Sequence, residues 1–355
     1  MDAKKAESRN LDLLRAFAVL CVFFSHMILC CIPGHHVDDA VQTPVVAFWY
    51  GVGDVGVLMF FVHTSLVLLY SLERNGGSFL NFYIRRFFRI YPLSTACIAL
   101  VLLFHVPYVP EMSFAAPAWS AVVSNLLLIQ NLTYAKDLIS PLWTLPREVQ
   151  MYLALPFIFV LLRRMGSAPV VLLLWWAAGV AAPHYPVLTC VPCFFGGVLA
   201  YQIGREKTYA MAARWWPAAL LALVAVHLAV RLTLVPDYRP DYVLCVAVGA
   251  LIPNFRDLAS SWLTRACHVV AKYSYGIYLF HLPILWLALF KLAFLPVALR
   301  WLALAVLMTV VPWAMYRWLE APLIETGRRL ATRVKIPARR VAGAENLGPV
   351  SSAEL

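Results

Sequence analysis

Long apolar stretches alternate with short polar segments over most of the chain, a pattern typical of a protein that crosses a membrane many times. A spanning helix needs about 20 predominantly apolar residues. By that measure the sequence predicts an all-α integral membrane protein with about ten transmembrane helices. They are expected at 11–32, 45–72, 87–106, 147–164, 168–182, 187–203, 214–235, 240–253, 268–292 and 296–320, of which 168–182, 187–203 and 240–253 are short.

Two segments fall outside this pattern. Residues 117–131 are apolar but short, so we interpret them as a re-entrant or interfacial piece rather than an eleventh span. Residues 335–355 are polar and rich in small residues, which predicts a disordered cytoplasmic tail. The sequence contains no internal repeat. We therefore expect one membrane domain over 9–326 and no appended soluble domain.

Composition agrees with a membrane protein. The 355 residues are 62% hydrophobic and 13% charged, whereas soluble domains carry about 25% charged residues. This argues against a soluble enzyme or a nucleic-acid binder, although the net charge is +11. With the N-terminus placed inside, cytoplasmic segments collect 21 Lys and Arg residues and outer loops collect 6. The basic excess thus predicts orientation, with both termini cytoplasmic and the protein in the inner (plasma) membrane.

Cysteine and metal-ligand patterns are weak. Eight cysteines are too few for a disulfide scaffold in a chain of this length, and the Cys190–Cys193 motif has no second pair at zinc spacing. The histidines and aspartates within 35–39 make only a weak cluster. We expect no metal cofactor.

The first predicted helix contains two ionisable residues, Arg15 and His26. Eleven residues at 100° each come within about 20° of three full turns, so both side chains project from one face, about 16 Å apart along the axis. One interpretation is that Arg15 reaches the inner headgroups while His26 bonds a neighbouring helix. Ionisable residues inside a membrane more often serve function, and we favour that interpretation for the pair.

A cationic cluster stands at the inner end of the third span, where Arg86 and Arg89 are three residues apart and share a helix face. These arginines are either an ordinary positive-inside anchor or a clamp for the phosphates of a cytosolic ligand, a task that suits the planar guanidinium group. Glu320, at the inner end of the last span, is an expected partner for them.

Two other helices carry polar residues. Glu148 and Tyr152 are four residues apart at the outer start of the fourth span. Glu148 either complements the helix dipole or points into an outer cavity with His26. In the ninth span Ser274, Tyr278 and His281 form one polar stripe at helical spacing.

These segments together resemble the membrane-bound acyltransferase-3 family, bacterial O-acetyltransferase-like proteins with ten membrane helices, over nearly the whole of 9–326. The resemblance lies in the R-x10-H pair, the R-x-x-R pair, and the segments FFVHTSLVLL, LWTLPREVQMYLALP and SYGIYLFH. There are several departures. Thr64 and Ser65 stand where many members carry Ser-Gly, and Thr144 stands where the family motif has Ser. Many members carry an acidic residue where this chain has Leu58, and Asp54 lies one helical turn upstream.

The resemblance implies transfer of an acyl group, usually acetyl, from a cytosolic acyl-CoA such as acetyl-CoA to a hydroxyl of an exported or cell-surface carbohydrate or glycolipid. It implies that Arg86 and Arg89 hold the phosphates of coenzyme A, with Arg15 and Glu320 beside them. His26 would be a general base or a transient acyl carrier. Glu148 would orient His26 or the acceptor, while Tyr278 and His281 would donate hydrogen bonds to the oxyanion.

Two other classes of protein share some of these features. A transporter or flippase of a glycan or lipid precursor would also have about ten helices and ionisable residues within them. Such a protein is expected to show inverted repeats with matching broken helices, and the sequence shows neither. A structural scaffold gives no reason for Arg15 and His26 to share a face.

Overall fold

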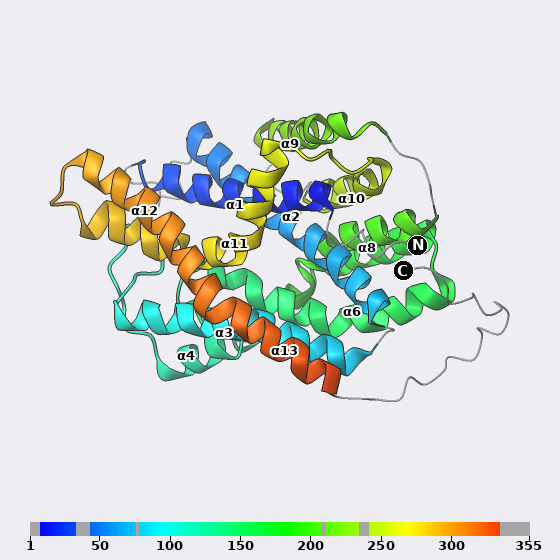
Figure 1. Cartoon of the computed structure of the whole chain (residues 1–355), viewed down its shortest axis with the longest axis horizontal. Coiled ribbons are helices and arrows are strands. Elements are labelled where there is room, and N and C mark those ends of the chain that lie inside the picture. The colour runs from blue at the N-terminus through cyan, green and yellow to red at the C-terminus, as the bar shows by residue number, and fades with distance from the viewer. Residues whose placement is uncertain (1–7, 33–42, 76–77, 207–210, 234–240, 334–355) are drawn as a thin grey trace, which may run out of the picture.

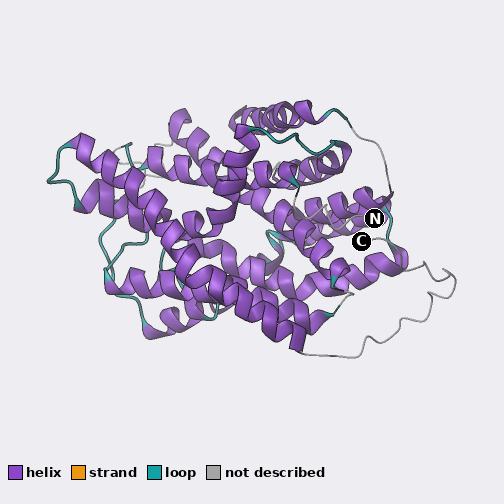
Figure 2. Ribbon diagram, in the orientation of Figure 1, coloured by secondary structure: helices purple, strands orange, loops and turns teal. Residues whose placement is uncertain are grey.

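The computed structural model describes residues 8–32, 43–75, 78–206, 211–233 and 241–333. Within these ranges the chain is helical, with connecting loops and no β-strand (Figure 2). The predicted all-α fold is confirmed. The α-helices are α1 Arg9–Leu29, α2 Pro44–Arg74, α3 Phe79–Leu103, α4 Trp119–Leu126, α5 Gln130–Thr133, α6 Leu145–Met165, α7 Ala168–Ala181, α8 Val191–Glu206, α9 Trp216–Thr233, α10 Asp241–Leu251, α11 Trp262–Leu285, α12 Val297–Met315 and α13 Ala321–Arg333.

Each of the ten expected spans corresponds to one of these helices. Among the described residues, eight helical segments are long and apolar enough to cross a membrane, and the two shorter apolar ones are Ala168–Ala181 and Asp241–Asn254. The protein is therefore a multi-pass membrane protein. Ten crossings and cytoplasmic termini stay predictions, because the N-terminal residues and the predicted tail at 335–355 lie outside the described residues.

Helix ends differ most from the predicted ones in two places. Helix α3 begins at Phe79 rather than near residue 87, so the cationic cluster lies within the helix and not at its mouth. The last predicted span does not end at residue 320. A π-helical turn, Tyr316–Glu320, joins α12 to α13 without a break. Hydropathy misses both extensions because the added turns carry cationic residues, which lower their mean hydropathy.

The short apolar segment at 117–131 forms α4 and part of α5. Helix α4 has 8 residues and α5 has 4, so neither is long enough to span a bilayer. Helix α4 packs beside α3 (Figure 1). The prediction of a non-spanning piece agrees with these lengths.

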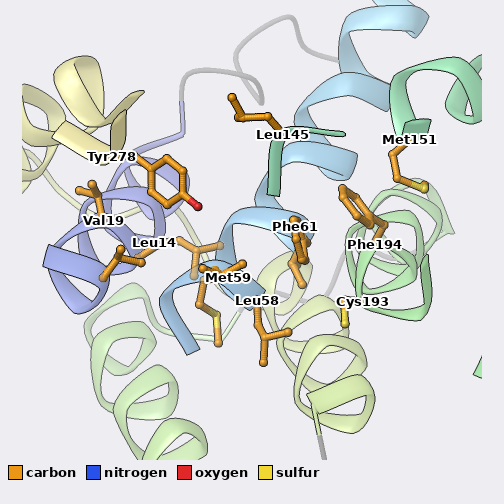
Figure 3. Close-up of a cluster of buried hydrophobic side chains, with 14 of the residues drawn as sticks. Leu14, Val19, Leu58, Met59, Phe61, Leu145, Met151, Cys193, Phe194 and Tyr278 are labelled. Carbon is orange, nitrogen blue, oxygen red and sulfur yellow. The ribbon is translucent and has the colours of Figure 1, made fainter. Parts of the chain in front are cut away.

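Helix α2 is the central element of the fold. Its 31 residues rise about 46 Å, and it packs against α1, α6, α8, α9 and α10. A Cβ atom at Gly56 would lie 2.5 Å from the carbonyl oxygen of Ala18, so only glycine allows α1 to approach this closely. The apolar core that results includes Leu58 and Phe61 of α2 (Figure 3).

Hydrogen bonds join helix ends and loops that the charge pattern assigns to the same side of the membrane. At the predicted inner side the Asn10 amide donates to the carbonyl of Arg256, with Nδ2 and O 3.0 Å apart. At the predicted outer side the Tyr242 hydroxyl donates to the carbonyl of Thr189 over 2.9 Å. The expected alternation of loops is thus compatible with the packing of the helices.

Candidate active site

The larger of two adjoining cavities is lined by arginines, and we call it the arginine cavity. Its volume is about 110 Å³, and four helices around α2 contribute to its polar lining. Arg15 enters from α1, Arg86 and Arg89 from α3, Glu148 from α6 and Tyr275 from α11. The first-helix arginine and the R-x-x-R pair, which lie far apart in the sequence, therefore line one space.

Charges in this cavity are only partly balanced. Arg89 forms an ion pair with Glu320, whose side chain is 1% exposed, so the partner expected for the inner arginines is confirmed. The Arg89 guanidinium also lies 5.9 Å from the centre of the Tyr275 ring. Arg86 forms no ion pair with any described residue, and its buried Nε has no hydrogen-bond partner among them. A cation thus faces the cavity without a carboxylate of its own.

Glu148 lies with the arginines and not in the cavity that contains His26. Its Oε1 accepts a hydrogen bond from the Tyr152 hydroxyl at 2.5 Å, and the Thr64 hydroxyl is 3.5 Å away. The expectation that Glu148 points into an outer cavity with His26 differs from this geometry. The reason is the 3-10 turn Ser140–Thr144 before α6. This turn lines the histidine cavity, so α6 and Glu148 begin beyond it.

The smaller cavity, which we call the histidine cavity, has a volume of about 50 Å³. His26 and Ser25 line it from α1, Tyr50 and Asp54 from α2, and Trp143 from the 3-10 turn. Arg15 and His26 therefore face two different cavities, one above the other along the same side of α1. The shared face predicted from their spacing agrees with this arrangement.

His26 stacks on His281 of α11. The two ring centres are 5.0 Å apart and the ring planes are inclined by 26°. His281 is fully buried, and its Nδ1 lies 2.6 Å from the carbonyl oxygen of Tyr278. Because a carbonyl only accepts hydrogen bonds, Nδ1 carries the proton and Nε2 is left as an acceptor. That buried Nε2 has no hydrogen-bond partner among the described residues.

Val57 and Tyr278 line both cavities and so form the partition between them. The Tyr278 hydroxyl lies 2.8 Å from the Thr144 hydroxyl and 3.0 Å from the carbonyl oxygen of Pro141. Figure 3 shows Tyr278 reaching into the core from α11. Ser274 and His281 are buried on the same helix, as the predicted polar stripe requires.

The sequence assigned no catalytic or binding role to three of the residues at these cavities. His63 and Thr64 both line the arginine cavity, and Thr144 bonds Tyr278. The signal for Thr64 is its place on the α2 face that also carries Val57 and Phe60 at helical spacing. The predicted weak cluster at 35–39 lies outside the described residues, and no group of three metal-ligating side chains occurs among those that are described.

Comparison with known proteins identifies the family of this chain. The family model described as an acyltransferase domain, acyltransferase-3, matches residues 8–317, nearly the whole chain. The chain belongs to the acyltransferase-3 family. It is an acyltransferase, and the predicted family is confirmed.

Two curated relatives of this acyltransferase are informative. Acyltransferase MdmB of Streptomyces mycarofaciens is 34% identical over 187 residues, which cover 50% of this chain but only 44% of that protein. Nodulation protein 10 of Rhizobium leguminosarum bv. viciae is 27% identical over 312 residues, 78% of this chain and 82% of the relative. No solved structure gives a significant match.

The structure of this acyltransferase shows where the residues at one departure from the family pattern lie. Leu58 is 6% exposed and packs in the apolar core. Asp54, one turn away on α2, lines the histidine cavity and forms an ion pair with Arg231 of α9. The carboxylate of this chain thus lies at a different level of the helix from the acidic residue of many members.

Proposed function

We propose that this acyltransferase moves an acetyl group from cytosolic acetyl-CoA to a hydroxyl of an exported or cell-surface carbohydrate or glycolipid, in the inner (plasma) membrane. The observation that carries the proposal is the contact of the two cavities at Val57 and Tyr278. One cavity is cationic and the other contains a histidine. A donor with phosphates and an acceptor hydroxyl can therefore meet at this partition from opposite sides of the membrane.

The arginine cavity suits the donor. Coenzyme A carries several phosphate groups, and guanidinium groups form strong charge-assisted hydrogen bonds with phosphate. Arg86 forms no ion pair with a described carboxylate and so remains available to a phosphate. Along α1, Arg15 and His26 are about 16 Å apart, a distance that the extended pantetheine arm bridges. Glu320 and Glu148 moderate the positive charge, and Glu320 competes with phosphate for Arg89.

The histidine cavity suits the chemical step. His26 takes the proton of the acceptor hydroxyl as the oxygen attacks the thioester carbonyl carbon, and the carbon–sulfur bond then breaks. The coenzyme A thiolate leaves and takes up that proton. General-base assistance of this kind contributes about 10²–10⁴-fold. Stacking on His281 fixes the plane of the His26 ring. The Tyr278 hydroxyl, which donates to the Pro141 carbonyl in this structure, turns to donate to the oxyanion when the thioester is attacked.

The role that we propose for Glu148 differs from the one expected from the sequence. Its carboxylate accepts the Tyr152 hydroxyl and faces the arginine cavity. We assign it to the donor side, where it holds the cavity in shape around the acyl-CoA, rather than to the orientation of His26.

The test is the His26→Ala variant, purified in lipid nanodiscs, with His268→Ala as the matched control because that histidine side chain is 67% exposed. Release of coenzyme A from acetyl-CoA and mass spectrometry of envelope glycans are measured. We expect His26→Ala to abolish transfer at normal abundance while His268→Ala keeps it. Retained transfer in His26→Ala would contradict the general-base role. Glycan translocation without acetylation by the unaltered protein would indicate a flippase instead.

A further inference from the structure

A third cavity opens between α2 and α9, and we call it the α2/α9 cleft. Its volume is about 450 Å³, larger than either of the other two. The α2 wall includes Phe48, Tyr50 and Asp54, and the α9 wall includes Leu228 and Arg231. Tyr50 and Asp54 also line the histidine cavity. The cleft therefore adjoins the cavity that contains His26.

An ion pair crosses the cleft. Arg231 Nη2 lies 2.6 Å from Asp54 Oδ2, and the two side chains are 34% and 44% exposed. Behind the pair, Asp241 Oδ1 lies 4.0 Å from Arg231 Nη1 and 3.6 Å from His227 Nε2. A pair this exposed contributes at most about 1 kcal/mol to stability. Its polar atoms remain accessible from the cleft, and Asp241 holds the arginine from the other side.

The backbone is arranged to allow this pair. A Cβ atom at Gly51 would lie 2.9 Å from Leu228 Cδ2 and 4.0 Å from Arg231 Cδ. The missing side chain lets α9 approach α2 and leaves room for the arginine stem to reach Asp54, three residues further along α2. Tyr50 is four residues before Asp54 and so lies on the same face.

We propose that the α2/α9 cleft binds the acyl acceptor and that Asp54 and Arg231 select a polyhydroxylated acceptor, a sugar. This proposal rests on the proposed acyltransferase function and adds the acceptor site to it. Neighbouring sugar hydroxyls both donate and accept hydrogen bonds, and a carboxylate beside a guanidinium offers one acceptor group and one donor group at that spacing. The rings of Tyr50 and Phe48 supply apolar surface for the C–H faces of a sugar. A hydroxyl that passes Tyr50 and Asp54 enters the cavity of His26.

The test uses the full-length protein in nanodiscs with acetyl-CoA. The acceptors are the p-nitrophenyl glycosides of glucose, galactose, mannose and N-acetylglucosamine, and n-octanol is the hydroxyl acceptor without neighbouring hydroxyls. If none of the glycosides is used, the acceptor is a dilution series of envelope glycans extracted from the source cells. The variants are Arg231→Gln, Asp54→Asn and the reversed pair Asp54→Arg with Arg231→Asp. Arg205→Gln is the matched control, because Arg205 pairs with Glu73 at similar exposure between α8 and α2.

We expect Arg231→Gln and Asp54→Asn to raise the KM of the sugar acceptor about tenfold or more, the loss typical of one charge-assisted hydrogen bond. The KM of acetyl-CoA should stay within twofold, roughly the scatter of a neutral surface change. Arg205→Gln should change neither constant. The reversed pair restores the ion pair but exchanges donor and acceptor, so its acceptor KM should stay raised.

Three results would overturn the assignment of the cleft alone. The first is an unchanged acceptor KM in both single variants. The second is full recovery of the acceptor KM in the reversed pair, which would mark a purely structural ion pair. The third is transfer to n-octanol as efficient as transfer to sugars. A different result overturns the proposed function itself. If the unaltered protein transfers acetyl to none of these acceptors, the envelope glycans included, then the acyl-CoA-to-sugar reaction fails and the cleft assignment fails with it.

Discussion

Arg86 and Arg89 are neighbours in one motif, yet the structure predicts different consequences for their loss. Arg86 has no carboxylate partner among the described residues, whereas Arg89 is paired with Glu320. Substitution of Arg86 by Gln should remove a contact with donor phosphate and break no ion pair among the described residues. A charge-assisted hydrogen bond contributes about 1.5–3 kcal/mol, and about 1.4 kcal/mol corresponds to a factor of ten. We therefore expect Arg86→Gln to weaken coenzyme A binding by about 10- to 150-fold at an unchanged Tm.

Arg89→Gln should weaken binding and also destabilise the fold. It leaves Glu320, with a side chain that is 1% exposed, without its cation, and breaking a buried pair from one side costs about 3–5 kcal/mol. The double variant Arg89→Gln with Glu320→Gln replaces the ion pair by two neutral amides. It should recover most of the lost Tm but not the binding of coenzyme A.

The assay is titration calorimetry of coenzyme A against each variant in nanodiscs, with thermal unfolding followed in parallel. Acetyl-pantetheine, which lacks the nucleotide and its phosphates, is the control ligand and should bind the unaltered protein and Arg86→Gln equally. Binding of coenzyme A by Arg86→Gln within twofold of the unaltered protein would refute the phosphate role. An equal loss for acetyl-pantetheine would show that the substitution deforms the cavity instead.

Two further predictions concern the chemical step and the packing. His281→Gln should lower kcat at least tenfold, within the range of general acid–base effects, and leave the KM of acetyl-CoA unchanged. The reason is that His281 contacts His26 and does not line the arginine cavity. Steady-state kinetics measure both constants, and a change in the KM of acetyl-CoA alone would contradict the prediction. Gly56→Val should reduce the yield of folded protein in size-exclusion chromatography, since its Cβ would lie 2.5 Å from the Ala18 carbonyl oxygen. Gly179→Ala is the control, where the nearest atom would be 3.8 Å away, and equal yields would refute the packing argument.

Local sequence properties determined most of the fold. Hydropathy located a helix for each of the ten expected spans, because length and apolar content are properties of single segments. Helical periodicity placed Arg15 and His26 on one side of α1 and grouped Ser274, Tyr278 and His281 on α11. Charge complementarity also predicted a partner for the inner arginines, which is Glu320.

Tertiary structure alone decided which of these residues meet. Because of the 3-10 turn before α6, Glu148 lies in the arginine cavity. No pattern in the sequence reports the depth in the membrane at which a helix begins. The partition at Val57 and Tyr278 and the pair of Asp54 with Arg231 join residues from separate helices. Such contacts depend on how closely the helices approach one another. Hydropathy and periodicity describe each helix by itself, so the cavities, and with them the site, exist only once the helices are packed.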